Sequence, residues 1–238
     1  MSKYAILLSG GTDSATLLGK LLTEGCCKSD ILAIAFNYGQ KHDIELRASR
    51  LVAKYYGVEH KTLNLSNIYK DAENPLLKES NKAIPKGPYV AKQVATYIPF
   101  RNGLFISAAA AYAMSIWQDE KDIFISLGAH TDDSVGDVYA DCSKTFTQYM
   151  DRAIMQGTYN VVKLFSPFAA RRYTKAKIVK AGLKIGVPYH LTWSCYEGST
   201  GQGACGKCST CIDRLKAFHI NGAQDPIKYK EVTDVSNI

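Results

Sequence analysis

Long hydrophobic runs are missing from this sequence. No stretch approaches the roughly 18 uninterrupted apolar residues that a membrane-spanning helix needs. The first eight residues lead directly into Ser9-Gly10-Gly11, without the apolar core and the small-residue cleavage site of a secretory signal. We therefore expect a cytoplasmic protein.

Charged residues are not abundant, at 21% of 238 residues, whereas hydrophobic residues make up 46%. These proportions exclude a disordered chain, a collagen and a coiled coil. Residues 1–159 hold 17 basic and 17 acidic side chains, but residues 160–238 hold 12 and 5. The basic last third predicts a solvated lysine-rich surface, a site for a phosphate-bearing ligand or a groove for nucleic acid.

Short apolar runs alternate with stretches in which apolar residues recur at helical spacing. The predicted strands are 3–8, 31–37, 60–65, 123–127 and 161–165, and the predicted helices are 15–22, 43–56, 102–117, 141–157 and 174–184, with a last helix from near Cys211. Strands that alternate with helices in this way are joined by right-handed crossovers and form a parallel sheet. The sequence thus predicts an α/β fold and a single domain over residues 1–238.

Proline is scarce, with seven residues, and four of them lie between Ser66 and Pro99. This polar, lysine-rich segment interrupts the alternation of strands and helices. It is too long for an idle connection in a compact domain. We expect residues 66–99 to form a lid or an excursion that contacts a second subunit.

A glycine-rich turn, Ser9-Gly10-Gly11-Thr12-Asp13-Ser14, joins the first predicted strand to the first helix. Such a turn presents backbone N–H groups and the positive end of a helix dipole to an anion. Its spacing differs from the phosphate loop GxxxxGK[ST] and from the dinucleotide fingerprint GxGxxG. The turn predicts an anion site, and a plain structural turn is the alternative.

Seven cysteines in a chain without an export signal are expected to be reduced thiols. Cys195, Cys205, Cys208 and Cys211 have the spacing C-x9-C-x2-C-x2-C. Four thiolates favour a closed, structural zinc site over a catalytic one, although an iron–sulfur cluster uses the same ligands. We expect a small zinc module over residues 190–221, integrated with the domain.

The turn at Ser9–Ser14 resembles the pyrophosphate loop of the PP-loop ATPases. Together with the C-terminal cysteines it resembles the QueC family of queuosine biosynthesis. Three further segments agree with that family: Ile98–Asn102 resembles P-G-R-N, Tyr139–Cys142 resembles Y-P-D-C, and Thr174–Ala176 resembles N/T-K-A. The resemblance covers nearly the whole chain and implies a Rossmann-like parallel sheet of the PP-loop ATPase type with a small C-terminal zinc-binding module.

The resemblance implies a ligase that forms a carbon–nitrogen bond at the expense of ATP. In the family, 7-carboxy-7-deazaguanine and ammonia become 7-cyano-7-deazaguanine through an acyl-adenylate and an amide, and a second ATP drives the last step. It further implies Mg²⁺, structural Zn²⁺, small-molecule substrates and a homodimer, with no membrane and no direct nucleic-acid contact. Phe100 stands where the family has glycine and Ala140 where it commonly has proline, and both departures adjoin the expected substrate residues.

The resemblance also implies which residues meet ATP. Contacts are expected from Leu8, Ser9, Gly10, Gly11, Thr12, Asp13, Ser14, Ala15, Thr16, Leu17 and Leu18. Ser14, Asp13 and Lys175 are the expected catalytic residues. Asp13 would hold magnesium or cap the first helix, and Lys175 would neutralise charge on the α-phosphate, with a plain surface lysine as the alternative.

Substrate contacts are expected from Arg101, Asn102, His130, Asp132 and Asp141. His130 and Asp132 follow a predicted strand, at the edge where open α/β sheets bind ligands. The Asp141 carboxylate could accept hydrogen bonds from the N1–H and 2-amino groups of a guanine-like base. Simpler alternatives are an exposed cation for Arg101 and helix capping for Asn102 and Asp141. His130 and Asp132 could instead belong to an acidic turn.

Other functions fit parts of the sequence. A PP-loop tRNA thiolation enzyme also adenylates its substrate, but it transfers sulfur through cysteine, and Cys142 has no evident partner thiol. A QueC-like enzyme with a different acceptor is a second alternative. A non-enzymatic zinc-ribbon module would bind nucleic acid in a salt-dependent manner, but it would have no need of the glycine-rich turn.

Overall fold

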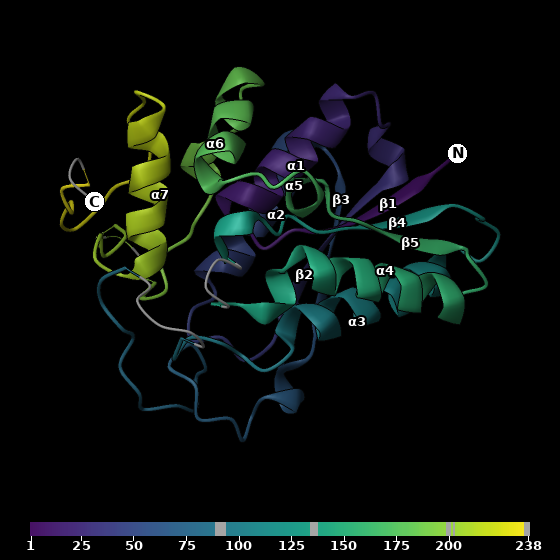
Figure 1. Cartoon of the computed structure of the whole chain (residues 1–238), viewed down its shortest axis with the longest axis horizontal. Helices are drawn as coiled ribbons and strands as arrows, with labels where there is room; N and C mark the ends of the chain where they lie inside the picture. The colour runs from purple at the N-terminus through teal and green to yellow at the C-terminus, as the bar shows by residue number, and fades with distance from the viewer. Residues whose placement is uncertain (89–93, 134–137, 199–200, 202, 236–238) are drawn as a thin grey trace.

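The protein is described by a computed structural model that covers residues 1–88, 94–133, 138–198, 201 and 203–235. Its centre is a five-stranded parallel sheet in the order β3-β2-β1-β4-β5 (Figure 1). The strands are β1 (Lys3–Leu7), β2 (Ile31–Asn37), β3 (Glu59–Asn64), β4 (Ile123–Ser126) and β5 (Val162–Phe165). Because β1 lies in the middle, the chain winds outward on both sides of it, and the predicted parallel α/β fold is confirmed.

Helices cover both faces of the sheet. Alternate residues of β1 point to opposite faces, so that Ala5 and Leu7 belong to one buried cluster and Ile6 to the other. Helices α3 and α4 cover the first face, and α1, α2, α6 and α7 cover the second (Figure 1). The helices are α1 (Thr12–Thr23), α2 (Ile44–Tyr56), α3 (Arg101–Ile116), α4 (Lys144–Gly157), α5 (Pro167–Ala170), α6 (Lys175–Lys184) and α7 (Ser209–Ile220).

Two local predictions need correction. Helix α4 begins at Lys144 and not at Asp141, because Ser143 caps it: the Ser143 Oγ accepts a hydrogen bond from the Phe146 N–H at 3.1 Å. Helix α5 was not predicted, because it is a single turn, which begins with Pro167 at its first position. In the described part of the chain, no helix combines the length and the hydrophobicity required to cross a membrane.

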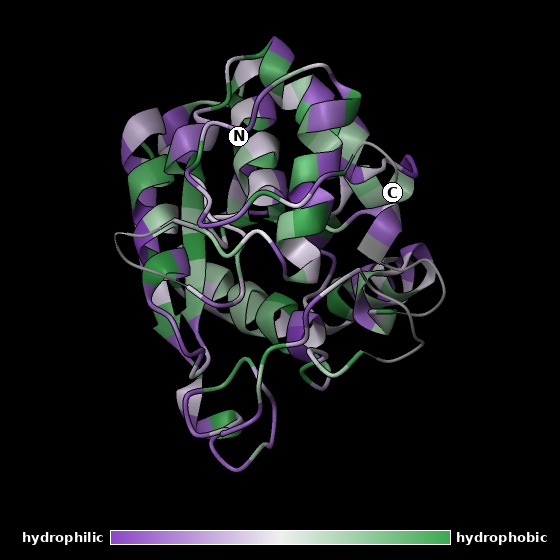
Figure 2. Ribbon diagram, turned by 90° about the vertical axis from the view of Figure 1, so that its left-hand side faces the viewer, coloured by the Kyte–Doolittle hydropathy of each residue, from purple (hydrophilic) through white to green (hydrophobic). Residues whose placement is uncertain are grey.

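The segment between β3 and α3 projects from the body of the molecule. Its described residues, 66–88 and 94–99, contain a short 3-10 turn at Ser66–Ile68 and no longer helix or strand. Figure 2 shows the projection at the bottom of the molecule, mostly in hydrophilic colours. The Lys41 N–H donates to the carbonyl of the buried Leu76 at 2.8 Å, which anchors the segment to the residues after β2. A role as a lid or as a subunit contact stays a prediction.

A buried ion pair fastens the C-terminal tail to α7. The fully buried Arg214 donates through Nε to Asp225 Oδ2 at 2.6 Å and through Nη2 to Oδ1 at 2.9 Å. Its Nη1 donates to the Thr192 Oγ1 at 2.8 Å. Because this bidentate pair also reaches the segment before the cysteines, it holds the tail, α7 and residues near Thr192 together.

Candidate active site

A cavity of about 230 Å³ opens at the carboxyl ends of β1, β2 and β4, where open parallel sheets bind ligands. Three groups of polar and aromatic residues line it. The loop end consists of Ser9, Gly11, Asp13, Ser14 and Lys175. The arginine end consists of Tyr38, Gln40, Glu45, Arg101, Phe105, Asn102 and Asp141. The cysteine-module wall consists of Trp193, Ser194, Tyr196, Thr210 and Asp213.

The glycine-rich turn packs tightly against the start of α2. Gly10 has φ +84°, in the left-handed region that favours glycine. A Cβ at this position would lie 2.6 Å from the Glu45 carbonyl oxygen and 2.7 Å from the Ser49 backbone nitrogen. Only glycine can therefore hold the turn this close to α2.

Hydroxyl groups and a helix terminus converge on the same turn. The Ser14 Oγ donates to the Gly11 carbonyl at 3.3 Å and lies 3.1 Å from the Ser9 Oγ. Helix α1 begins at Thr12, so the positive end of its dipole faces the loop end of the cavity. This arrangement suits an anion such as a phosphate group.

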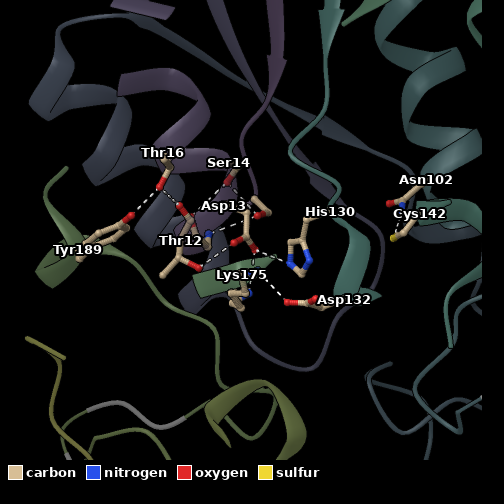
Figure 3. Close-up of polar contacts among 12 residues, drawn as sticks. Thr12, Asp13, Ser14, Thr16, Asn102, His130, Asp132, Cys142, Lys175 and Tyr189 are labelled. Atoms are coloured by element: carbon tan, nitrogen blue, oxygen red, sulfur yellow. Dashed lines mark hydrogen bonds and ion pairs between the residues drawn. The ribbon is translucent and has the colours of Figure 1, made fainter. Parts of the chain in front are cut away.

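Asp13 and Lys175 form an ion pair across the loop end. The Lys175 Nζ lies 2.9 Å from Asp13 Oδ2, and the His130 Nε2 lies 3.7 Å from the same oxygen (Figure 3). Burial alone would raise the pKa of Asp13, but Lys175 and His130 outweigh burial and hold it well below its ordinary value. Asp132 accepts a hydrogen bond from the Lys175 backbone N–H at 2.7 Å and so fixes the start of α6.

Part of the predicted ATP segment faces the core instead of the cavity. Leu8, Ser9, Gly11, Asp13 and Ser14 line the cavity. The others predicted to meet ATP do not line it, namely Gly10, Thr12, Ala15, Thr16, Leu17 and Leu18. The Thr16 Oγ1 donates to the Thr12 carbonyl at 2.7 Å and lies 2.7 Å from the Tyr189 hydroxyl, so it supports the turn from behind.

Aromatic residues hold the guanidinium of Arg101 at the arginine end of the cavity. Its guanidinium carbon lies 5.4 Å from the centre of the Tyr38 ring and 6.0 Å from that of Phe105. Nη1 also donates to the Tyr38 hydroxyl at 3.4 Å. These cation–π contacts fix the guanidinium while leaving most of its donors to other partners.

Asn102 and Asp141 join two segments that are far apart in the sequence. The Asn102 backbone N–H donates to Asp141 Oδ2 at 2.9 Å. The Asn102 side-chain amide donates to the Cys142 Sγ at 3.1 Å, and Figure 3 shows these two residues. The Asp141 carboxylate therefore holds the first turn of α3, a helix distant from it in the sequence, and does not cap the helix that was predicted to begin at Asp141. Asp141 also lines the cavity, so its substrate role stays a prediction.

Glu45, in the first turn of α2, was not among the predicted site residues. Glu45 lines the arginine end of the cavity. Burial raises the pKa of Glu45 to about 7, and the attraction of Arg101 only partly opposes this effect. A signal was present in the sequence, because Glu45 lies shortly after β2, near the sheet edge where His130 and Asp132 follow β4.

The four C-terminal cysteines form one buried cluster. The Sγ atoms of Cys195, Cys205, Cys208 and Cys211 all lie within 4.8 Å of one another. The Cys205 and Cys211 Sγ atoms are 3.9 Å apart, close to the edge of about 3.8 Å of a tetrahedron with zinc–sulfur bonds of about 2.3 Å. Hydrogen bonds from Cys195 and Cys211 hold the pKa of Cys208 far below its ordinary value. The cluster thus fits a metal ion, and it confirms the predicted grouping of these residues.

The cluster and the cavity share a wall. Ser194 and Tyr196, on either side of the ligand candidate Cys195, line the cavity. The Trp193 backbone N–H donates to the Gly10 carbonyl at 2.8 Å, and its indole N–H donates to the Cys195 carbonyl at 3.0 Å. The cysteine module is therefore connected directly to the glycine-rich turn.

The structure brings nine of the predicted site residues into one cavity, namely Leu8, Ser9, Gly11, Asp13, Ser14, Arg101, Asn102, Asp141 and Lys175. His130 and Asp132 are beside Asp13 and Lys175 but do not line the cavity in the described part of the chain. Glu45, Trp193 and the other residues of the cysteine-module wall were not predicted. The position of Glu45 after β2 was a signal, whereas only tertiary packing brings the wall residues to the cavity.

The two departures from the family pattern adjoin the arginine end. Phe100 has φ +53°, a left-handed conformation in which glycine is free of strain. Its ring packs edge-on against Phe146, with ring centres 5.8 Å apart. A Cβ at Gly103 would lie 2.3 Å from this ring, so glycine at 103 makes room for it. Ala140 begins the 3-10 turn Ala140–Cys142, where nothing explains the absence of proline.

Comparison with known proteins agrees with the family resemblance that the sequence motifs indicated. A family model described as queuosine biosynthesis protein QueC matches residues 3–222. A 7-cyano-7-deazaguanine synthase of Caldicellulosiruptor saccharolyticus is 38% identical over 229 residues, which cover 96% of both chains. Those of Thermoplasma acidophilum and Archaeoglobus fulgidus are each 40% identical, covering 96% and 94% of this chain and 92% and 89% of theirs.

Among solved structures, the U34-tRNA thiolase NcsA from Methanococcus maripaludis, with its [4Fe-4S] cluster, has a similar fold. The TM-score is 0.50 at 20% sequence identity, and the match covers 83% of this chain and 61% of the thiolase. A likeness at this level of identity concerns the fold alone. It agrees with the parallel α/β fold that the family resemblance implied.

Proposed function

This chain belongs to the QueC family, and on that premise we propose that it is an ATP-dependent ligase that converts 7-carboxy-7-deazaguanine and ammonia to 7-cyano-7-deazaguanine. The synthase activity in queuosine biosynthesis follows from the family. The observation that supports the ATP chemistry is the Asp13–Lys175 pair beside the glycine-rich turn, in the same cavity as the arginine end.

The first step is activation of a carboxylate. A carboxylate reacts poorly with ammonia because its leaving group would be oxide, whereas an acyl-adenylate offers AMP. In our proposal the backbone of Gly11 and the hydroxyls of Ser9 and Ser14 hold the departing pyrophosphate. Lys175 stabilises negative charge that develops on the α-phosphate. His130 and Asp132 act through their contacts with Asp13 and Lys175, and they orient this pair.

The second step reuses the same site. Ammonia attacks the acyl carbon, AMP leaves, and the product is a primary amide. A second ATP adenylates the amide oxygen, and loss of AMP with two protons leaves the nitrile. Arg101, Asn102 and Asp141 would line the acceptor part of the cavity during both activations.

Metal ions have two separate roles in the proposal. The cysteine cluster would hold a single Zn²⁺, because a four-iron cluster interposes its own atoms and keeps thiolates further apart than one ion does. The zinc would fix the cysteine-module wall. The Asp13 carboxylate is a hard oxygen ligand of the kind that Mg²⁺ prefers, and the ion would neutralise phosphate charge there.

A tRNA thiolation activity has less support. Such a reaction needs a reactive cysteine in the site, and Cys142 is the cysteine that lines the cavity among the described residues. Its sulfur accepts a hydrogen bond from Asn102 within the capping arrangement of α3. A homodimer and the absence of direct nucleic-acid contact stay predictions.

The test is mass spectrometry of a reaction with purified protein, Mg-ATP, ammonium and 7-carboxy-7-deazaguanine. We expect the nitrile together with AMP. Ser14→Ala should remain folded and lose most of the turnover, since it removes one hydroxyl of the loop end. Cys142→Ser serves as the second comparison: retained turnover contradicts thiolation, and the lack of any AMP-linked product from the unaltered chain contradicts the proposed function.

A further inference from the structure

Four carboxylates line the cavity in the described part of the chain, and they differ in what they already bind. Asp13 is paired with Lys175, and Asp141 accepts the Asn102 backbone N–H. Asp213 lies on α7, in the opposite, cysteine-module wall. Glu45 has neither a hydrogen bond nor an ion pair within residues 1–88, 94–133, 138–198, 201 and 203–235. Its acceptor capacity is therefore available to a ligand.

Arg101 lines the same end of the cavity. Aromatic rings hold its guanidinium, and no carboxylate among the described residues lies within ion-pair distance of it. The Arg101 guanidinium and the Glu45 carboxylate attract each other electrostatically, but no hydrogen bond or ion pair joins them in the described part of the chain. The cavity thus presents a donor and an acceptor that do not satisfy each other. Because burial outweighs the attraction of Arg101 and raises the pKa of Glu45, the carboxylate gains from any further hydrogen-bond donor.

A 7-deazaguanine acceptor has a complementary edge. Its O6 accepts hydrogen bonds, and the adjacent N1–H and 2-amino group donate them. A carboxylate can accept from two parallel donors, and a guanidinium can donate to the neighbouring carbonyl. The flanking Tyr38 and Phe105 add aromatic surface beside a planar base.

We propose that Glu45 is a specificity-determining residue that accepts hydrogen bonds from the N1–H and 2-amino groups of a 7-deazaguanine acceptor, while Arg101 donates to O6. This assignment rests on the proposed function for the class of acceptor. It gives Glu45 the base-recognising role that was expected of Asp141, whose Oδ2 already accepts the Asn102 N–H at the start of α3.

The test is a thermodynamic cycle that combines removal of the Glu45 charge with removal of the 2-amino group of the ligand and compares the four Kd values. Calorimetry measures the Kd of 7-carboxy-7-deazaguanine and of the same acid without its 2-amino group, for the unaltered chain and for Glu45→Gln. For the unaltered chain we expect loss of the 2-amino group to weaken binding about 30-fold, as for a hydrogen bond to a charged group. Glu45→Gln should bind the full acid at least as weakly as this, and removal of the 2-amino group should then change its Kd less than about threefold.

Asp213→Asn and Asp141→Asn make the same chemical change at the other candidate carboxylates. If the 2-amino group is coupled to either of them, or if the unaltered chain and Glu45→Gln lose the same factor, the assignment of Glu45 is wrong. Thermal unfolding of each variant separates lost binding from lost folding. If the unaltered chain converts the acid to the nitrile but the cycle is additive, only the role of Glu45 fails. If it neither binds nor converts the acid, the proposed function fails as well.

Discussion

At the scale of single residues, Glu45 has a carboxylate whose ionisation is unfavourable in the folded chain without a ligand. It lies in the first turn of α2, faces the cavity, and has a pKa raised to about 7 by burial. An acid whose pKa is higher in the folded chain than in the unfolded chain binds protons more tightly when folded. Its ionisation therefore opposes folding, which is a common property of residues placed for function.

The sign of the pH dependence follows from this difference. The ordinary pKa of a glutamate is about 4.3, so the unfolded chain releases this proton first, and stability falls as pH rises from about 4.3 to about 7. We expect Glu45→Gln to raise the free energy of unfolding at pH 8, relative to the unaltered chain, by on the order of 2 kcal/mol more than at pH 4.5. Urea unfolding of both proteins at the two pH values measures it. An equal difference at both values would show that Glu45 ionises freely in the folded chain.

Site residues could be predicted from the sequence where they belong to a short motif of recognisable spacing. Ser9–Ser14 and the cysteine spacing were such cases: most residues of the turn line the cavity, and the four cysteines form one cluster. Asp141 was predictable as a polar residue near the cavity, but its bond to the Asn102 N–H depends on where α3 begins. The position of Glu45 after β2 was a signal, but only packing shows that its carboxylate has no hydrogen bond or ion pair within the part of the chain that the structure describes.

Among the elements, α2 is the one whose packing decides the shape of the glycine-rich turn. Its backbone at Glu45 and Ser49 leaves no space for a Cβ at Gly10. Side-chain periodicity predicted α2 well, from residue 43 against an observed start at Ile44. The contact with the turn was beyond prediction, because it is made by backbone atoms that carry no sequence signal.

Gly25 offers a matched control for Gly10. Both have a positive φ, +97° at Gly25 and +84° at Gly10, but a Cβ at Gly25 would meet nothing within 4 Å. We expect Gly25→Ala to cost about 1 kcal/mol of stability from backbone strain alone. Gly10→Ala should cost about 3 kcal/mol or more, because the added methyl group must push α2 and the turn apart. Denaturant unfolding compares the two, and equal losses would mean that α2 yields easily.

At the scale of the whole molecule, residues 193–196 and the start of α7 close the cavity from the side of the cysteine cluster. Residues from β1 to α7 meet there, so the complete site needs nearly the whole chain. The order of the strands and helices followed from alternation along the sequence. The meeting of Ile98–Asn102 with Tyr139–Cys142 did not, since their contact depends on how α3 and α4 lie on one face of the sheet.

Loss of one cysteine from the cluster should therefore affect both metal content and stability. We expect Cys208→Ser to lose its bound metal and to unfold at a temperature about 10 °C lower, because metal binding contributes folding free energy to this module. Elemental analysis and thermal unfolding measure the two effects. Cys27→Ser, at an exposed cysteine outside the cluster, should change neither. A Cys208→Ser protein that keeps its metal and its unfolding temperature would contradict the role of the cluster.

Trp193 gives the site a fluorescent reporter of its own. The chain has two tryptophans, and the other, Trp117, lies at the far end of α3 and does not line the cavity. The Trp193 indole is in the cavity wall, bonded to the backbone of the cysteine module. Its emission should respond both to occupancy of the cavity and to metal loss. In a Trp117→Phe protein, the two events could be followed without any attached dye, in the same cuvette and in real time.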